Sequence, residues 1–523
     1  MEPGALVSTE YIMVAVFILG LVGWGFVKRH STKTMEQSFL ADRKVPGFIA
    51  SISTVATTLN VNDFVGLSGS VYAVGIIMAH IPLTSGICLL FLSLMLVHKL
   101  RAMKVFTAGE WLGKRYHPGI GHAYSIVWSC IWMVFNLGLY NYGGALILHT
   151  LMGWNFYFSV VLLSVVGAFY TITGGFGVVV GAHVLQVMLM FFPFLVIAPL
   201  AIFKAGGIAN IISSLPANQT DIWTAHTPFG PISLMFFGMI ITTMSYWSSE
   251  AQILQRPLSC RSSEDASITY LGASFWFVIL MPFLIILPAL AAKVLFTGLE
   301  KPDLAAPMLI KTFLPHGLYG VAVVGLMSGF LSSAASQINS FCAMFTADVY
   351  KKLIRPGQQE SHYMLTSKIA GVIFAFCAIG TALLIYRAPT GMFIYAIGIL
   401  ATIMPPFAAV ILLGAMWKKA NSKGAAFGLV IGGGLAVVLF MLATYTKLFS
   451  SIADDSMFFR AALTYIVTLS VTWLFSMLLG VQAGEDQTAA ATASVKITKR
   501  VWKLAFALAS AISVMYVFFT IIF

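Results

Sequence analysis

Side chains suited to binding ions and small solutes concentrate at three places in this sequence, each inside an otherwise apolar stretch. The segment 53–63 carries serine, threonine and asparagine and ends in Asp63. The segment 242–250 carries hydroxyl and aromatic side chains and ends in Glu250, and the segment 328–340 contains five serines. Hydroxyl, amide and carboxylate oxygens are ligands of hard cations and hydrogen-bond partners of polar solutes. The chemistry that these segments offer is reversible binding.

Patterns typical of covalent chemistry or of a resident metal are missing from the sequence. It contains no phosphate-binding loop of the form GxxxxGK[ST] and no HExxH motif. Its five cysteines are scattered without CxxC spacing and are expected to be small core residues. We therefore expect neither an enzyme nor a cofactor.

The elements that must position the three polar segments are membrane-spanning helices. Hydrophobic residues make up 59% of the chain and charged residues only 9%, too few to cover a soluble globule. Apolar runs of about 20 residues, the length that crosses a bilayer, recur from Tyr11 to Phe523. The net charge of +12 comes in short clusters without a continuous basic face, which argues against nucleic acid as a partner. The sequence predicts an all-α polytopic membrane protein embedded in the lipid bilayer.

Proline, glycine and charged residues mark the ends of the apolar runs and divide the chain into about fourteen spans. The first run is expected to remain as a helix, because its basic cluster follows it and does not precede it as in a signal peptide. The expected spans are 11–27, 47–73, 76–98, 121–150, 156–174, 178–203, 230–254, 268–296, 317–350, 364–386, 390–417, 424–446, 457–481 and 500–522.

Lysine and arginine collect in alternate loops, which the positive-inside rule assigns to the cytoplasm. The loops expected inside hold Lys28, Arg29, Lys33, Arg43, Lys44, Arg101, Lys104, Lys114, Arg115, Arg256, Arg261, Lys351, Lys352, Arg355, Lys418, Lys419, Lys423, Lys496, Lys499 and Arg500. The loops expected outside hold only Lys204, Lys301, Lys311, Arg387 and Lys447. An even number of spans then places the N-terminus and the C-terminus on the external side of the plasma membrane.

The first two polar segments lie five spans apart, and each belongs to the first helix of a set of five. Because five is odd, the two sets cross the membrane in opposite directions, as in an inverted repeat whose broken helices form a site at the membrane midplane. The alternative is that serine, threonine and glycine mark close helix packing. Packing does not require the acids Asp63 and Glu250 at membrane depth.

Motifs in a fixed order along most of the chain carry a resemblance to a known family. They are Gly66-Leu67-Ser68-Gly69-Ser70, Tyr170-Thr171-Ile172-Thr173-Gly174-Gly175, Tyr246-Trp247 with Gln255-Arg256, Pro282-Phe283 with Leu287-Pro288, Asp348-Val349-Tyr350-Lys351, and Trp417-Lys418-Lys419. Each motif alone is weak, but their order and spacing together are specific. The sequence resembles the solute:sodium symporter (SSS) family of membrane transporters.

The resemblance implies a LeuT-like fold, in which two inverted repeats of five helices form the transport core. On this sequence the first repeat covers 47–203 and the second covers 230–417, within a single membrane transport domain over 1–523. One extra helix at 11–27 precedes the repeats, and three extra helices within 424–523 follow them. The total agrees with the count of about fourteen spans made from apolar run length.

The resemblance also implies a site for sodium as the coupling ion. Ala56, Leu59 and Gly329 occupy positions that supply backbone carbonyl oxygens to this site. Ser332 and Ser333 occupy positions that supply hydroxyl oxygens. Such neutral oxygens are suitable ligands for a hard monovalent cation.

A solute site is expected beside the same stretch. Members of the family that carry galactose read the sugar with amide and carboxylate groups that are largely missing here, so galactose itself is not expected, although a sugar- or polyol-like solute is favoured. For Asp63, three roles stay open: a salt bridge to a cationic group, acceptance of polyol hydroxyls, or capping of the second half of its broken helix. The expected solute-binding residues are Asn60, Asp63, Ser85, Thr243 and Tyr246.

Trp247, Glu250 and His183 are expected to gate or couple transport. An aromatic ring at the positions of Tyr246 and Trp247 closes the cavity in the family, with ordinary packing as the alternative. Glu250 is expected to lie nearer the cytoplasmic end and to pair with Arg256. His183 stands where family members commonly carry an acid that helps hold a second sodium, so a second sodium is not expected. The alternative for His183 is a neutral ring bonded to a nearby backbone carbonyl.

The function expected from these features is sodium-coupled symport of a small organic solute by alternating access. The first alternative is a proton-coupled transporter of an amino acid, amine or carboxylate that uses Asp63, His183 or Glu250. A second alternative is a transporter-like membrane sensor, which the lack of a polar domain after the last span disfavours. A third is a channel.

Overall fold

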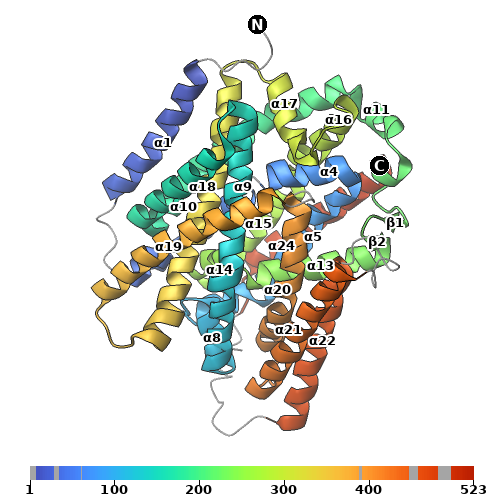
Figure 1. Cartoon of the computed structure of the whole chain (residues 1–523). Coiled ribbons are helices and arrows are strands. Elements are labelled where there is room, and N and C mark those ends of the chain that lie inside the picture. The colour runs from blue at the N-terminus through green and yellow to red at the C-terminus, as the bar shows by residue number, and fades with distance from the viewer. Residues whose placement is uncertain (1–7, 29–33, 61, 388–391, 447–456, 481–495) are drawn as a thin grey trace.

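The computed structural model describes residues 8–28, 34–60, 62–387, 392–446, 457–480 and 496–523, and these are almost entirely helical (Figure 1). The only strands among them are the short antiparallel pair β1 (His226–Thr227) and β2 (Gly230–Pro231). The absence of a larger sheet fits a chain that crosses lipid, where a helix satisfies all backbone hydrogen bonds within one segment.

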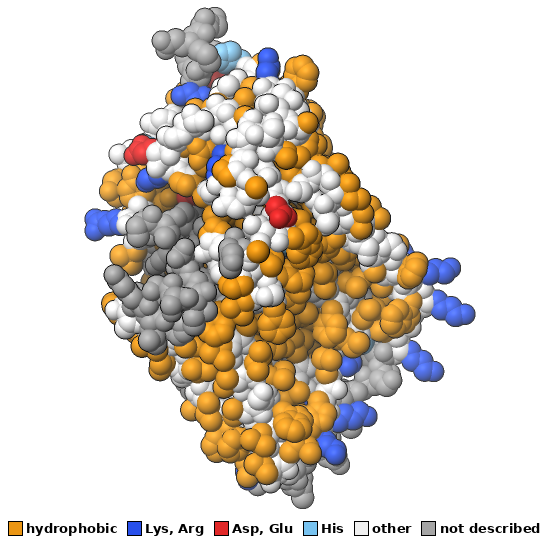
Figure 2. Space-filling model, turned by 90° about the vertical axis from the view of Figure 1, so that its right-hand side faces the viewer, with side chains coloured by type: hydrophobic (Ala, Val, Ile, Leu, Met, Phe, Trp, Pro, Cys, Tyr) orange, Lys and Arg blue, Asp and Glu red, His pale blue; other side chains and the backbone are white. Residues whose placement is uncertain are grey.

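The apolar helices have the lengths that spans require. Ten helical segments among the described residues are long and apolar enough to cross a membrane, and three shorter apolar helices accompany them. Together with α13 (Ile232–Ser249), these segments overlap all fourteen expected spans. Figure 2 shows a broad band of hydrophobic side chains across the surface, with charged side chains gathered on either side of it. This is the surface expected of a multi-pass membrane protein.

Three helices are interrupted where the sequence places glycine or polar residues. The helix α3 (Gly47–Thr58) ends at Leu59, and the chain resumes as the π-helix η2 (Asn62–Leu67) and α4 (Ser68–Val74). The helix α13 ends before Glu250, whose backbone is extended, and α14 (Ala251–Leu258) follows. Gly175 interrupts α10 (Phe156–Lys204) with φ of 67°, a conformation that favours glycine. The expected spans 156–174 and 178–203 therefore meet at a kink without a loop.

The remaining elements are listed here in two groups. Helices in the first half are α1 (Ser8–Lys28), α2 (Met35–Leu40), η1 (Ala41–Arg43), η3 (Ile76–Ala79), α5 (His80–Met95), α6 (Val97–Ala102), α7 (Ala108–Arg115), α8 (Pro118–Val127), η4 (Trp128–Trp132), α9 (Met133–Met152), α11 (Gly207–Ser214) and α12 (Ala217–Thr220). Helices in the second half are α15 (Ser263–Met281), η5 (Pro282–Ile286), α16 (Leu287–Leu295), η6 (Pro302–Leu304), α17 (Ala305–Phe313), α18 (Leu318–Met344), η7 (Phe345–Ile354), α19 (Glu360–Tyr386), α20 (Met392–Met416), α21 (Ser422–Tyr445), α22 (Met457–Leu479) and α24 (Lys499–Ile522).

The broken helix α3–η2–α4 lies in the interior of the bundle. Helices α10, α15 and α18 pack against α3, while α9, α17 and α20 contact η2. Helix α1 lies at one edge against α10 and α18, and α21 and α22 pair with each other away from it (Figure 1). Polar groups in the broken helix are thus shielded from lipid by surrounding helices, which is the condition for non-helical backbone at membrane depth.

Contacts involving the loops show which loops lie together at each of the two ends of the molecule. At the first, the terminal end, His316 lies 3.1 Å from Glu10 near the N-terminus, and Trp223 donates to Thr520 near the C-terminus over 2.9 Å. At the second, the basic end, loops expected in the cytoplasm contact one another. Arg43, for example, donates to the carbonyl oxygen of Val105 over 3.2 Å. Arg29, Lys33 and Lys447 from the expected loops lie outside the described residues.

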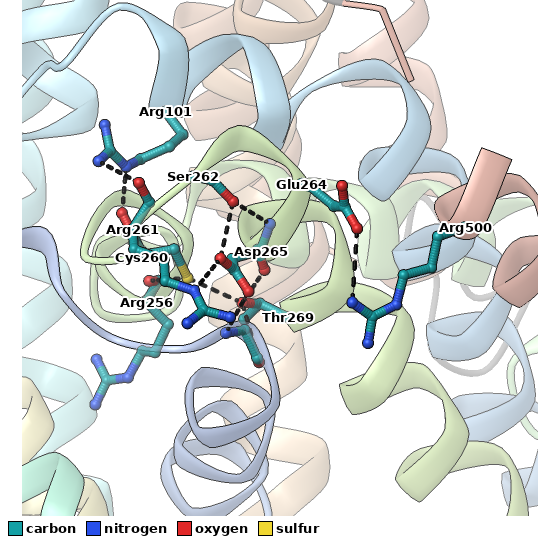
Figure 3. Close-up of polar contacts among 10 residues, drawn as sticks. Arg101, Arg256, Cys260, Arg261, Ser262, Glu264, Asp265, Thr269 and Arg500 are labelled. Atoms are coloured by element: carbon teal, nitrogen blue, oxygen red, sulfur yellow. Dashed lines mark hydrogen bonds and ion pairs between the residues drawn. The ribbon is translucent and has the colours of Figure 1, made fainter. Parts of the chain in front are cut away.

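A layer of polar contacts closes the basic end at the beginning of α3 (Figure 3). The backbone of Val45 pairs with the turn between α14 and α15, accepting from Arg261 N and donating to Ser259 O over 3.2 Å each. Asp265 accepts from the Gly47 amide over 3.0 Å and from the Arg261 guanidinium over 2.7 Å. The beginning of α3 cannot move away from α14 and α15 without breaking these bonds.

Cys260 provides a chemical probe of that layer. Its side chain is fully buried, Arg101 donates to its carbonyl oxygen, and burial raises the pKa of its thiol to about 12. Because the thiolate is the reactive form, a single-cysteine variant that keeps Cys260 is expected to resist a hydrophilic maleimide at pH 7.5 while the layer is closed. Mass spectrometry of the labelled protein, with the urea-unfolded chain as positive control, measures this. Complete labelling of the folded protein within minutes would contradict a closed layer.

Candidate functional site

The end of α3 presents backbone carbonyl oxygens that its own helix does not use. The last carbonyls of any helix lack an intrahelical partner, and those of Ala56 and Thr57 belong to this group. Both face α18, where Ser332 donates to Ala56 O and Ser333 donates to Thr57 O over 2.8 Å. Ser332 also donates to Gly329 O over 2.9 Å. Four of the five positions expected at the sodium site therefore meet at the contact between α3 and α18.

Leu59, the fifth position, is buried where the backbone leaves the helix with φ of −79° and ψ of 98°. A Cβ built on Gly329 lies 3.6 Å from the Cα of the next residue, Asn60, which brings α18 close to the break. The arrangement offers carbonyl and hydroxyl oxygens at the negative end of a helix dipole, which favours a cation. Among the described residues, no group of three or more His, Cys, Asp or Glu side chains is placed to hold a metal.

A cavity of about 130 Å³ lies on the other side of the same break. All five residues expected to bind the solute line it: Asn60, Asp63, Ser85, Thr243 and Tyr246. Since one buried water needs roughly 10–15 Å³ of such volume, the cavity holds about ten water-sized positions, or a solute of on the order of ten non-hydrogen atoms. Segments far apart in the sequence, in α5, α9, α13 and α20, complete its wall.

Asp63 makes the capping contact, one of the three roles that the sequence left open. Its carboxylate accepts a hydrogen bond from the Asn60 amide over 3.1 Å, reaching back across the break as an acid does near the start of a helix. The same side chain lines the cavity. Asp63 is the only Asp, Glu, Lys, Arg or His among the described residues that line it.

Aromatic rings contribute more of the cavity wall than the sequence indicated. Tyr246 and Trp247 both line it, with their ring centroids 5.4 Å apart. Trp132, Phe277 and Phe458 line it as well and were not expected there. Their apolar runs look like ordinary packing segments, so no local signal distinguishes these rings from core residues. Asn136 also lines the wall.

The expected pair of Glu250 with Arg256 is wrong. Glu250 is fully buried and accepts from the Trp132 indole, while Arg256 donates to Gln252 O and to Ser336, and no ion pair joins them among the described residues. The cause is the break between α13 and α14. Glu250 has extended backbone outside both helices, so its side chain does not follow the face of α14 that carries Arg256.

His183 is buried near the sodium-site positions, as its place in the sequence indicated. Its Nδ1 lies 2.8 Å from the hydroxyl oxygen of Ser53, and the backbone of Ser332 also interacts with the ring, as the alternative supposed. Ser336 lies close by, 3.0 Å from Thr57 Oγ1, and receives a hydrogen bond from the Arg256 guanidinium. The guanidinium of Arg256 is therefore separated from Ser332, an expected sodium ligand, by the single side chain of Ser336.

Comparisons with known proteins agree with this geometry. The family model for the sodium:solute symporter family matches residues 38–432. The sodium/glucose cotransporter of Vibrio parahaemolyticus is 25% identical over 98% of this chain and 98% of its own. Sodium/myo-inositol cotransporter 2 of Oryctolagus cuniculus is 26% identical over 83% of this chain and 69% of its own.

Solved structures share the fold. A Na⁺-coupled sialic acid symporter in its substrate-bound outward-open state is 19% identical, with a TM-score of 0.79 over 90% of this chain and 98% of its own. The nucleobase-cation-symport-1 family transporter Mhp1 is 14% identical, with a TM-score of 0.53 over 87% of this chain and 98% of its own. The expected fold class is confirmed: the molecule is an all-helical, multi-pass protein with LeuT-like neighbours. Because the family model covers more than half of its length, the chain belongs to the sodium:solute symporter family, whose members couple sodium to solute transport and are not enzymes.

Proposed function

We propose that sodium binds where α3 meets α18 and that one small organic solute binds in the cavity on the other side of the break. The observation that carries this proposal is that one segment, the end of α3 with the break after it, contributes residues to both places. Carbonyl oxygens of Ala56 and Thr57 face the serines of α18, while Thr58, Asn60 and Asp63 line the cavity. A sodium ion that orders the end of α3 also orders the residues that hold the solute. Binding of each then favours the other, which is the thermodynamic requirement for coupling.

The solute is proposed to be small and hydroxyl-bearing. The names of two relatives specify glucose and myo-inositol, both rich in hydroxyl groups, and the cavity offers the hydroxyls of Ser85 and Thr243 as hydrogen-bond partners. Galactose itself is not favoured, because the amide and carboxylate groups expected to read it are largely replaced. The cavity size of about 130 Å³ accords with a molecule of monosaccharide size or smaller.

Transport is proposed to proceed by alternating access between two inverted repeats, 47–203 and 230–417. The basic end is proposed to face the cytoplasm, with both termini outside the plasma membrane. Separation of α3 from α14 and α15 would open the cavity inward, and the polar layer around Asp265 would have to break first. Trp247 and Tyr246 are proposed to close the cavity on its other side.

One sodium per cycle is proposed. A second cation next to the first would have to bind near Ser336, where the guanidinium of Arg256 already donates a hydrogen bond. His183 nearby supplies no carboxylate. Two cations in one buried region repel each other strongly because the local dielectric constant is low.

Reconstitution in liposomes tests the proposed function. An inward sodium gradient is expected to drive accumulation of at least one solute from a panel of sugars, polyols, amino acids, carboxylates and amines. Accumulation should follow the sodium gradient, disappear when potassium replaces sodium, and saturate with solute. Uptake that follows a proton gradient without sodium would contradict the proposal in favour of proton coupling. A solute-independent current that does not saturate would contradict it in favour of a channel.

A further inference from the structure

The solute cavity combines six aromatic rings with one carboxylate. The rings are those of Trp132, Tyr140, Tyr246, Trp247, Phe277 and Phe458. The faces of aromatic rings carry partial negative charge and attract cations, most strongly where water is excluded. No arginine or lysine is among the described residues that line the cavity, so nothing in the wall offsets the charge of Asp63.

Most polar groups in the wall are already occupied by the protein. Thr58 donates to Thr54 O over 2.7 Å and Thr242 donates to Gly238 O over 2.8 Å. The amide of Asn136 donates to the Tyr140 hydroxyl over 3.1 Å. A neutral polyol needs a partner for each hydroxyl that it buries, because an unpaired polar group in a buried site is costly. The threonine hydroxyls can still accept, but the wall has few hydrogen-bond donors left to give.

The carboxylate, in contrast, lacks a charged partner in the wall. Asp63 is 9% exposed, and its bond from the Asn60 amide is a bond to a neutral group. A charge at membrane depth is costly unless an opposite charge pairs with it. A solute that brings a positive charge would meet that need and would place apolar atoms against the rings at the same time.

We infer that the transported solute is an organic cation, a hydroxyl-bearing amine or quaternary ammonium compound whose nitrogen lies against Asp63 within the six rings. This inference rests on the proposed function and narrows its solute class. A hydroxyl on the same molecule fits the uncharged partners Ser85 and Thr243.

Matched pairs of solutes that differ in charge test the inference in proteoliposomes with an inward sodium gradient. The pairs are choline with 3,3-dimethylbutan-1-ol, and glucosamine with glucose. Sodium-driven uptake of at least one cation is expected to exceed uptake of its neutral partner by at least tenfold. The reason is that a buried pair of opposite charges contributes more binding free energy than a hydrogen bond between neutral groups does. Equal uptake within both pairs, or preference for the neutral partner, would overturn the inference and leave the symporter proposal intact. If no panel member accumulates with sodium, it is the proposed function that fails.

Variants at the acid separate its role in solute binding from a role in folding or in sodium binding. Asp63→Asn is expected to weaken cation uptake about tenfold or more, while Asp63→Glu retains part of it and Glu300→Gln, which removes an exposed loop acid, leaves it unchanged. Thermal stabilisation by sodium alone should persist in Asp63→Asn, which shows that this variant folds. Unchanged cation uptake in Asp63→Asn would overturn the inference. So would a loss of thermal stabilisation by sodium in the same variant.

Discussion

Replacing Ser332 and Ser333 together by alanine is expected to raise the sodium concentration for half-maximal transport by roughly 150-fold or more, since hydrogen bonds and similar contacts to a charged group contribute about 1.5–3 kcal/mol each. Ser332 reaches the carbonyl oxygens of Ala56 and Gly329, and Ser333 reaches that of Thr57. Alanine removes two hydroxyl ligands and leaves buried carbonyl oxygens unpaired. The solute affinity at saturating sodium should change little, because neither serine lines the cavity.

A matched control lies on the same helix. Ser328 is also buried in α18, one turn before Ser332, and its hydroxyl donates to Gln186 O over 3.3 Å, away from α3. Ser328→Ala removes the same group from the same helix and should leave the sodium dependence unchanged. Sodium-induced thermal stabilisation in detergent and uptake in liposomes both measure the difference. A double alanine variant that binds sodium as tightly as Ser328→Ala would show that the ion binds elsewhere.

Much of the fold was predictable because lipid imposes simple rules. The length of the apolar runs predicted the spans. The alternation of basic loops predicted which loops lie at the same end of the molecule, and several of those loops contact one another. Arg43 and Arg101, expected in the same compartment, both donate to backbone near the α14–α15 turn. The break at Leu59 was also visible, since polar residues crowd a segment that would otherwise face lipid.

The parts of the site that were missed depend on contacts between distant segments. Trp132 and Phe458 lie in apolar runs, and only the packing of their helices turns them toward the cavity. Glu250 was assigned the wrong partner because sequence proximity to Arg256 does not show that the helix breaks at Glu250 and directs its side chain elsewhere. His183 was placed near the right residues, but its hydrogen bond to Ser53 follows from the register of α10 against α3, which no local pattern encodes.

Helix α18 approaches helix α10 very closely at Gly325. Helices α10 and α18 pack along much of their length, and a Cβ built on Gly325 would lie 2.2 Å from Leu189 O and 3.1 Å from Met190 Cα. Both atoms belong to the backbone, so α18 would have to move away from α10. Gly325→Ala is therefore expected to destabilise the protein by about 1–3 kcal/mol or more. Ser332 lies two turns further along α18, so sodium affinity should fall with stability.

Gly181→Ala supplies the comparison that makes this result interpretable. Gly181 lies within α10, where a built Cβ would meet nothing within 4 Å, and alanine favours a helix over glycine by about 0.8–1.0 kcal/mol. This variant should be as stable as the parent protein or slightly more stable. Thermal unfolding in detergent, followed by size-exclusion chromatography, ranks the two variants. If Gly325→Ala is as stable as Gly181→Ala, the close contact between α10 and α18 does not exist, and the position of the α18 serines against α3 loses its support.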